Sequence, residues 1–170
     1  MKKVVFVFLF FVIGLTSFSQ VNMDVELIYY NKYKPITHLL LSSDDEIPKI
    51  ICITEGLDRE CIKKDTVYVD KYVYDNAIEL ISSISVSSFT NQVADISEMA
   101  IRSNGTDYFL LLSTEYGEVA MNFQNISDDT KNRGIIPYKK LWYDLLKAAH
   151  LKPRNFGVSF NKTELKLLLS

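Results

Sequence analysis

The chain contains little of what most catalytic and metal sites are built from. Among its 170 residues there are only two cysteines and two histidines, and they are scattered along the sequence. A zinc site usually takes four such ligands at characteristic short spacings, so none is expected here. Gly-x-Ser-x-Gly, His-Glu-x-x-His and glycine-rich phosphate-binding loops are also absent. The sequence therefore predicts no cofactor and no metal, although catalytic carboxylates need no local motif.

Clusters of basic residues and long apolar runs are equally scarce. The formal net charge is -2, and the lack of a basic patch argues against a nucleic-acid partner. The longest apolar run, Val4–Leu15, is shorter than the roughly 20 residues of a membrane-spanning helix. It follows Lys2-Lys3 and precedes the small residues Ser17 and Ser19. This pattern predicts a secretory signal peptide over residues 1–19, with a retained N-terminal anchor as the alternative.

Residues 20–170 have the length of one ordinary domain. They contain no internal repeat and no proline- or glycine-rich linker that would divide them. We therefore expect a single α+β globular domain that acts in a periplasm or outside the cell. No transmembrane segment is expected once the signal peptide has been removed.

The strongest β pattern lies in residues 97–125. Asn104-Gly105 separates two alternating runs, and this dipeptide is typical of a type I′ hairpin turn. The resulting register places Ile101 opposite Tyr108. A second turn then leads into a third alternating run, so the segment predicts a three-stranded antiparallel meander.

Other segments complete the expected fold. Strands are predicted at residues 23–30, 36–42 and 66–73, and 155–160 could form a short last strand. Helices are predicted at 75–86, with Asp75 as N-cap, and at 137–150. Asn161 and Glu164 resemble a capping box for a C-terminal helix. The separate blocks of strands and helices favour an α+β fold, in which the antiparallel sheet is covered by two main helices.

Both cysteines lie within residues 49–64. If residues 55–58 form a four-residue loop, Cys52 lies directly opposite Cys61 on the neighbouring strand, at the separation that a disulfide requires. Export would place the pair in a compartment that permits oxidation. We therefore expect a Cys52–Cys61 disulfide, with two free buried thiols as the alternative.

The two histidines have simple structural interpretations. His38 lies in an apolar run, where a hydrogen-bonded core or edge histidine is expected. A general base is the alternative, but no nucleophile motif accompanies it. His150 falls in the last turn of the predicted 137–150 helix, where a positive charge suits the helix dipole.

Three tyrosines are the candidate binding residues. Tyr29 lies in the first predicted strand, and Tyr68 and Tyr72 have equal parity on the strand predicted at 66–73, so they would share a face. Tyrosine combines a large contact area with a polar tip, which suits recognition surfaces. A half-buried sheet face is the alternative interpretation.

Together these features favour a non-enzymatic exported module, of binding or inhibitor type, that acts on another macromolecule. The partner would be a protein or an envelope component. A small exported hydrolase using scattered Asp, Glu or His38 and a structural envelope subunit are the alternatives. A binding module predicts a shallow tyrosine-lined surface, and a hydrolase predicts a deep pocket that holds a carboxylate or histidine with a shifted pKa. A structural subunit predicts a defined oligomer.

Overall fold

The structure is a computed structural model that describes residues 23–43, 47–56, 58–84, 106–124 and 135–168. Its strands are β1 (Asp24–Asn31), β2 (Lys34–Ser42), β3 (Lys49–Glu55), β4 (Cys61–Tyr68), β5 (Thr106–Thr114) and β6 (Gly117–Gln124). Its helices are α2 (Lys71–Ser83), α4 (Ile135–Ala148), the 3₁₀ helix η3 (Pro153–Phe156) and α5 (Lys162–Leu168).

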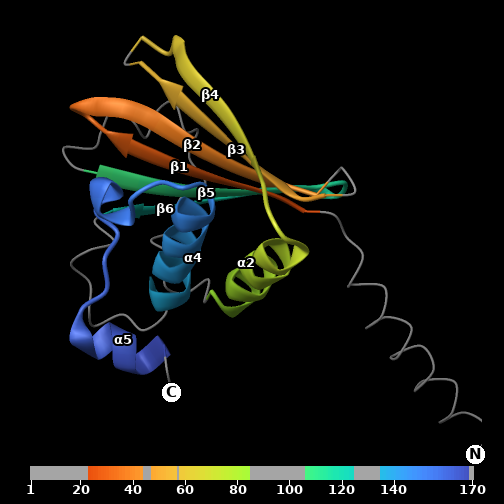
Figure 1. Ribbon diagram of the computed structural model, residues 1–170, viewed down its shortest axis with the longest axis vertical. Helices are drawn as coiled ribbons and strands as arrows, with labels where there is room; N and C mark the ends of the chain where they lie inside the picture. The colour runs from red at the N-terminus through yellow and green to blue at the C-terminus, as the bar shows by residue number, and fades with distance from the viewer. Residues whose placement is uncertain (1–22, 44–46, 57, 85–105, 125–134, 169–170) are drawn as a thin grey trace, which may run out of the picture.

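The six strands form one antiparallel sheet in the order β4-β3-β2-β1-β5-β6. Helices α2 and α4 lie side by side against one face of this sheet (Figure 1). Strand β1 is central, so that Val25 pairs with Leu41 of β2 on one side and with Leu112 of β5 on the other. The predicted α+β class, with antiparallel strands covered by helices, is confirmed.

The three-stranded meander predicted at 97–125 is wrong in its first strand pairing. Strand β5 has β1 along one edge and β6 along the other, so Tyr108 pairs with Tyr29 and Phe123 rather than with Ile101. The β5–β6 hairpin follows the prediction, whereas the Asn104-Gly105 turn lies outside the described residues. The alternating pattern fixes which side chains of a strand share a face, but it does not fix which strand lies alongside.

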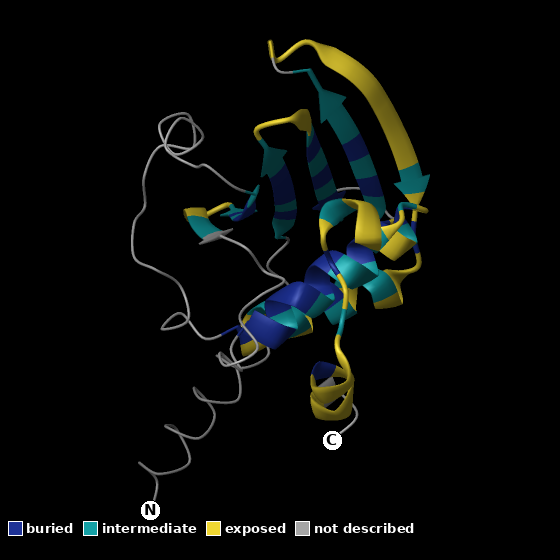
Figure 2. Ribbon diagram, turned by 90° about the vertical axis from the view of Figure 1, so that its left-hand side faces the viewer, coloured by how far each residue is buried: buried dark blue, intermediate teal, exposed yellow. Residues whose placement is uncertain are grey.

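The core lies between α4 and the sheet. Leu27 of β1 and Leu110 of β5 are fully buried, as is Trp142 of α4. The ring of Tyr108 meets that of Trp142 edge-on, with the centroids 5.5 Å apart. Figure 2 shows the buried colour concentrated on α4 and on the inner strands. Burying one large apolar side chain is worth about 1.5–3 kcal/mol, so this helix–sheet layer contributes strongly to stability.

The opposite face of the sheet is also apolar at its centre. Along each strand, the residues between those that face the helices lie on this opposite face. Two of them, Ile28 and Phe109, are only 7% and 2% exposed. This explains why Leu39, Leu40 and Leu41 follow one another in β2, because a strand with two apolar faces loses its alternation. The remaining apolar residues of this face in β2, β3 and β5 are Ile36, Leu40, Ile51, Ile53 and Leu111.

The strand predicted at 66–73 is wrong beyond Tyr68, where β4 ends. Helix α2 begins at Lys71, and its N-cap is Asp70 rather than Asp75. Asp75 lies inside the helix, where its carboxylate accepts a 2.6 Å hydrogen bond from the Lys71 ammonium. The apolar residues at helical spacing extend back through Ala77 to Val73. Their packing outweighs the preference of the β-branched Val73 for a strand.

The predicted disulfide is also wrong, because the β3–β4 register differs from the expected one. Cys52 pairs with Asp65, and Cys61 pairs with Glu55. Both cysteines are free; Cys52 is buried and Cys61 is exposed. The turn is longer than four residues, since Gly56 N donates to the Glu60 carbonyl at 2.9 Å. The turn begins one residue later than predicted, and the register also shifts between Thr54 and Glu55, so Cys61 does not lie opposite Cys52.

The C-terminal segment contains the predicted capping box. Asn161 Oδ1 accepts hydrogen bonds from the amides of Thr163 and Glu164, both at 2.9 Å, and Glu164 Oε2 accepts one from the Asn161 amide at 2.7 Å. The strand predicted at 155–160 is wrong, because η3 takes up its first two residues. This helix ends at Gly157, whose φ of 69° is left-handed, and a Cβ there would lie 2.8 Å from the Tyr108 hydroxyl.

Candidate functional site

The structure separates the three predicted binding tyrosines. The ring of Tyr29 packs edge-on against those of Tyr108 and Phe156, with centroids 5.5 and 5.2 Å away, and its side chain is only 4% exposed. Tyr68 and Tyr72 are 69% and 76% exposed. They do not share a strand, because Tyr68 ends β4 and Tyr72 lies in the first turn of α2. Only these two tyrosines of the three are available to a partner.

Backbone pairing brings another exposed apolar side chain close to this point. Tyr68 pairs with Lys49 of β3, and Val69 N donates to the Pro48 carbonyl at 2.9 Å. The residue before Pro48 is Ile47, which is 57% exposed. We call Ile47, Tyr68 and Tyr72 the β4–α2 corner. The sequence did not indicate Ile47, because its place beside Tyr68 depends on the β3–β4 register.

Strand β4 leads into this corner and forms one edge of the sheet. All of its side chains except that of Val67 are exposed, and Ile62 is 64% exposed. An edge strand presents unpaired backbone donors and acceptors to an incoming chain. Lys63 and Lys64 charge this edge, which discourages unselective pairing between strands. Lys63 is bound to Asp65, with 2.5 Å between nitrogen and oxygen.

His38 lies between two glutamates on the face of the sheet opposite the helices. Its Nδ1 is 2.8 Å from Glu26 Oε1, and its Nε2 is 3.5 Å from Glu55 Oε2. The side chain is 17% exposed. The predicted hydrogen-bonded histidine is therefore confirmed, and a role as general base stays a prediction. His150 lies beyond the end of α4 rather than in its last turn; its left-handed φ of 59° and its N–H bond to the Lys147 carbonyl stop the helix.

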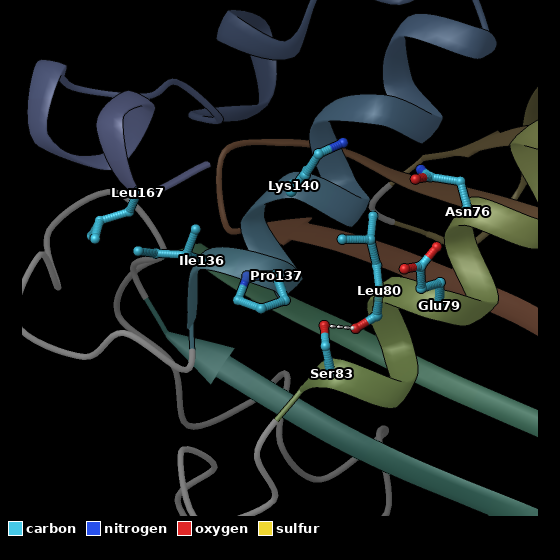
Figure 3. Close-up of a pocket in the computed structure, with 8 residues that line it drawn as sticks. All are labelled: Asn76, Glu79, Leu80, Ser83, Ile136, Pro137, Lys140 and Leu167. Carbon is cyan, nitrogen blue, oxygen red and sulfur yellow. Dashed lines mark hydrogen bonds between the residues drawn. The ribbon is translucent and has the colours of Figure 1, made fainter. Parts of the chain in front are cut away.

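A cleft of about 510 Å³ lies between α2, α4 and α5 (Figure 3). Its apolar lining is Leu80, Ile136, Pro137 and Leu167, and its polar lining is Asn76, Glu79, Ser83 and Lys140. The cleft has no local signal in the sequence, because its walls come from three helices that are separated in the chain.

Two polar groups of the cleft share one partner. Asp144 Oδ2 accepts a 3.2 Å hydrogen bond from the Asn76 amide, and it also binds the Lys140 ammonium. Ser83 Oγ donates to the Leu80 carbonyl at 2.7 Å. These side chains form no pair of nucleophile and base, since the serine hydroxyl is bound to backbone and no histidine lines the cleft. The arrangement is suited to holding a ligand.

Comparison with known proteins assigns no family to the chain. No protein-family model, no curated protein and no solved structure matches it. Across the described residues, no group of three or more His, Cys, Asp or Glu side chains is placed to hold a metal ion. None of the described helices is long and apolar enough to cross a membrane.

Proposed function

We propose that this chain is an exported binding module that docks onto a protein partner through the β4–α2 corner. The observation that carries this proposal is the exposure of Ile47, Tyr68 and Tyr72, which are between 57% and 76% exposed and flank the backbone junction where Val69 bonds to Pro48. Tyrosines placed in this way are typical of the residues that dominate binding energy in protein interfaces. A half-buried sheet face, the alternative for these tyrosines, does not describe side chains so exposed.

The corner also adjoins a strand edge that can contribute backbone contacts. Strand β4 is at the outside of the sheet, and Ile62 continues the exposed apolar surface along it. A partner segment that contacts the corner could extend along this edge, as in other complexes that use strand addition. The exposed Tyr33 and Tyr116 lie elsewhere, in the β1–β2 and β5–β6 turns; Tyr116 adjoins β6, the strand at the opposite edge of the sheet.

Replacing both corner tyrosines tests the docking surface. We expect the protein carrying Tyr68→Ser and Tyr72→Ser to lose a stoichiometric partner that the wild-type protein captures from its own cell envelope. Loss of a single interface hot spot costs about 2 kcal/mol or more, which corresponds to roughly 30-fold weaker binding. The melting temperature should barely change, because both side chains are mostly exposed.

The matched control is Tyr116→Ser, since this residue is 81% exposed but lies in the β5–β6 turn. It should retain the partner. Unchanged capture by the double variant, or a loss of stability that accounts for its loss of binding, would contradict the proposal.

Export can be tested separately. If residues 1–19 are a signal peptide, the protein recovered from the periplasm or the medium begins at Gln20. Recovery of the full chain from the cytosol, with Met1 retained, would remove the exported half of the proposal. The partner test on the β4–α2 corner would still stand.

A hydrolase centred on His38 is the second candidate, and one observation favours it. The 2.8 Å contact between His38 Nδ1 and Glu26 resembles the carboxylate–imidazole pairing that orients a catalytic base. The other nitrogen faces Glu55 rather than a nucleophile. Turnover of an ester, amide or glycoside substrate that disappears in His38→Gln would favour this candidate over docking.

A further inference from the structure

The cleft between α2, α4 and α5 has the volume and lining of a small-molecule site. At about 510 Å³ it falls within the range of pockets that take small organic ligands. Its apolar lining, Leu80, Ile136, Pro137 and Leu167, is contributed by all three helices. Leu167 is 40% exposed, so that part of this apolar surface faces the opening. An occupant must therefore have an apolar body.

The charges of the cleft are not balanced. Lys140 is paired with Asp144, which also accepts a hydrogen bond from Asn76, so this cation is already neutralised by its own helix. Glu79, on α2, is exposed, and no other side chain of the described residues pairs with it. Figure 3 shows its carboxylate on the α2 wall, next to Asn76 and across the cleft from Pro137. The charge left to a ligand is therefore negative.

We propose that this cleft binds a small amphipathic cation, with its apolar body against Leu80, Ile136, Pro137 and Leu167 and its ammonium group at Glu79. The apolar contacts supply most of the affinity, because each buried methylene is worth about 0.8 kcal/mol of transfer free energy. Glu79 selects the sign of the head group. This site is independent of the β4–α2 corner, and the proposal does not rest on the docking function.

Three ligands of matched chain length test the proposal on the full protein. Octyltrimethylammonium, 1-octanol and octanoate are titrated by isothermal calorimetry, and the site is located by amide chemical shifts in α2 and α4. We expect the cation to bind most tightly and octanoate least tightly, with shifts centred on residues 76–83 and 136–140. Glu79→Gln should lower the affinity for the cation about two- to fivefold, as expected for the loss of one exposed ion pair. The affinity for 1-octanol should not change.

Two further measurements separate the ligand site from changes in folding. Asp75→Asn makes the same carboxylate-to-amide change one turn earlier on α2, outside the cleft, and should leave all three affinities unchanged. Added salt should lower the affinity for the cation more in the wild-type protein than in the Glu79→Gln variant. Equal binding of the three ligands, a preference for octanoate, or the absence of shifts at the cleft would each overturn the proposal.

Discussion

Lys139 of α4 and Glu164 of α5 form a buried ion pair in which the Lys139 Nζ lies 2.8 Å from one carboxylate oxygen and 3.0 Å from the other. Their side chains are only 2% and 3% exposed. The same carboxylate accepts a hydrogen bond from the Asn161 amide, and the ammonium lies 5.4 Å from the centre of the Phe160 ring. This pair ties the C-terminal helix to the core and holds one wall of the cleft.

Breaking the pair from one side should be strongly destabilising. Glu164→Gln leaves the Lys139 ammonium buried without its counter-charge, and we expect a loss of about 3–5 kcal/mol in unfolding free energy. The double variant Lys139→Met with Glu164→Leu should recover most of that loss, because it removes both desolvated charges together. Urea denaturation of the wild-type, single and double variants measures these differences. A Glu164→Gln protein as stable as the wild type would show that the pair is solvated.

The Asn161 side chain of the capping box should stabilise α5 in addition to the ion pair, with which the box shares the Glu164 carboxylate. Asn161→Ala removes the side-chain acceptor of the Thr163 and Glu164 amides, at an expected cost of about 1 kcal/mol. Asn161→Asp keeps an acceptor in place and should cost little. Amide exchange of residues 162–168 reports the difference, with faster exchange in Asn161→Ala only. Equal exchange in both variants would contradict a capping role.

Alkaline pH should destabilise the fold through Tyr108. Its hydroxyl donates a 2.7 Å hydrogen bond to the Phe156 carbonyl, and burial together with the neighbouring Tyr29 raises its pKa above the ordinary value. Burial also raises the pKa of Tyr138. Because the folded-state pKa exceeds the unfolded value of about 10, this stabilisation is complete below about pH 10 and is lost as the pH rises toward the folded-state pKa.

Urea midpoints measured from about pH 8 to about pH 11 test this dependence. Tyr108→Phe should be less stable at neutral pH by about 1–3 kcal/mol, since the Phe156 carbonyl loses its donor, and should show a shallower alkaline decline. Tyr33→Phe, at an exposed turn position, is the control and should follow the wild type. An identical alkaline decline in Tyr108→Phe would assign the effect to other groups.

The two thiols should differ in reactivity. Cys61 is exposed, whereas burial, and to a lesser extent Asp65, raises the pKa of the Cys52 thiol and keeps it protonated. A thiol-reactive dye should label one cysteine in the native protein and both after unfolding. Cys61→Ser should abolish the native labelling. An intact mass that shows no free thiols would instead restore the disulfide interpretation.

Local signals in the sequence were sufficient for several elements. Alternation identified β1, a short apolar run identified β2, helical spacing identified most of α2 and α4, and the Asn161/Glu164 pair identified the start of α5. Each of these depends on residues a few positions apart, so the sequence pattern and the structure report the same contacts.

The errors arose where a contact depends on distant residues or on an unusual turn. The turn before β4 places Arg59 at a φ of 65°, and no glycine or asparagine at that position indicates such a conformation. That turn sets the register which separates the two cysteines. Likewise, Tyr29 and Tyr68 are the same residue type on predicted strands, but one strand is central and the other is an edge. The order of strands decides which tyrosine is exposed.

The central position of β1 has a consequence for how the protein assembles during synthesis. Residues 24–31 emerge from the ribosome early, but their second neighbour, β5, is not made until most of the chain has followed. Until then the middle of the future sheet is an open edge, and closing it requires bringing together segments with a large sequence separation. Hairpins β1–β2 and β3–β4 can form early, whereas the completed sheet must wait for β5. A nascent chain truncated before Thr106 should therefore remain only partly folded and sensitive to proteolysis.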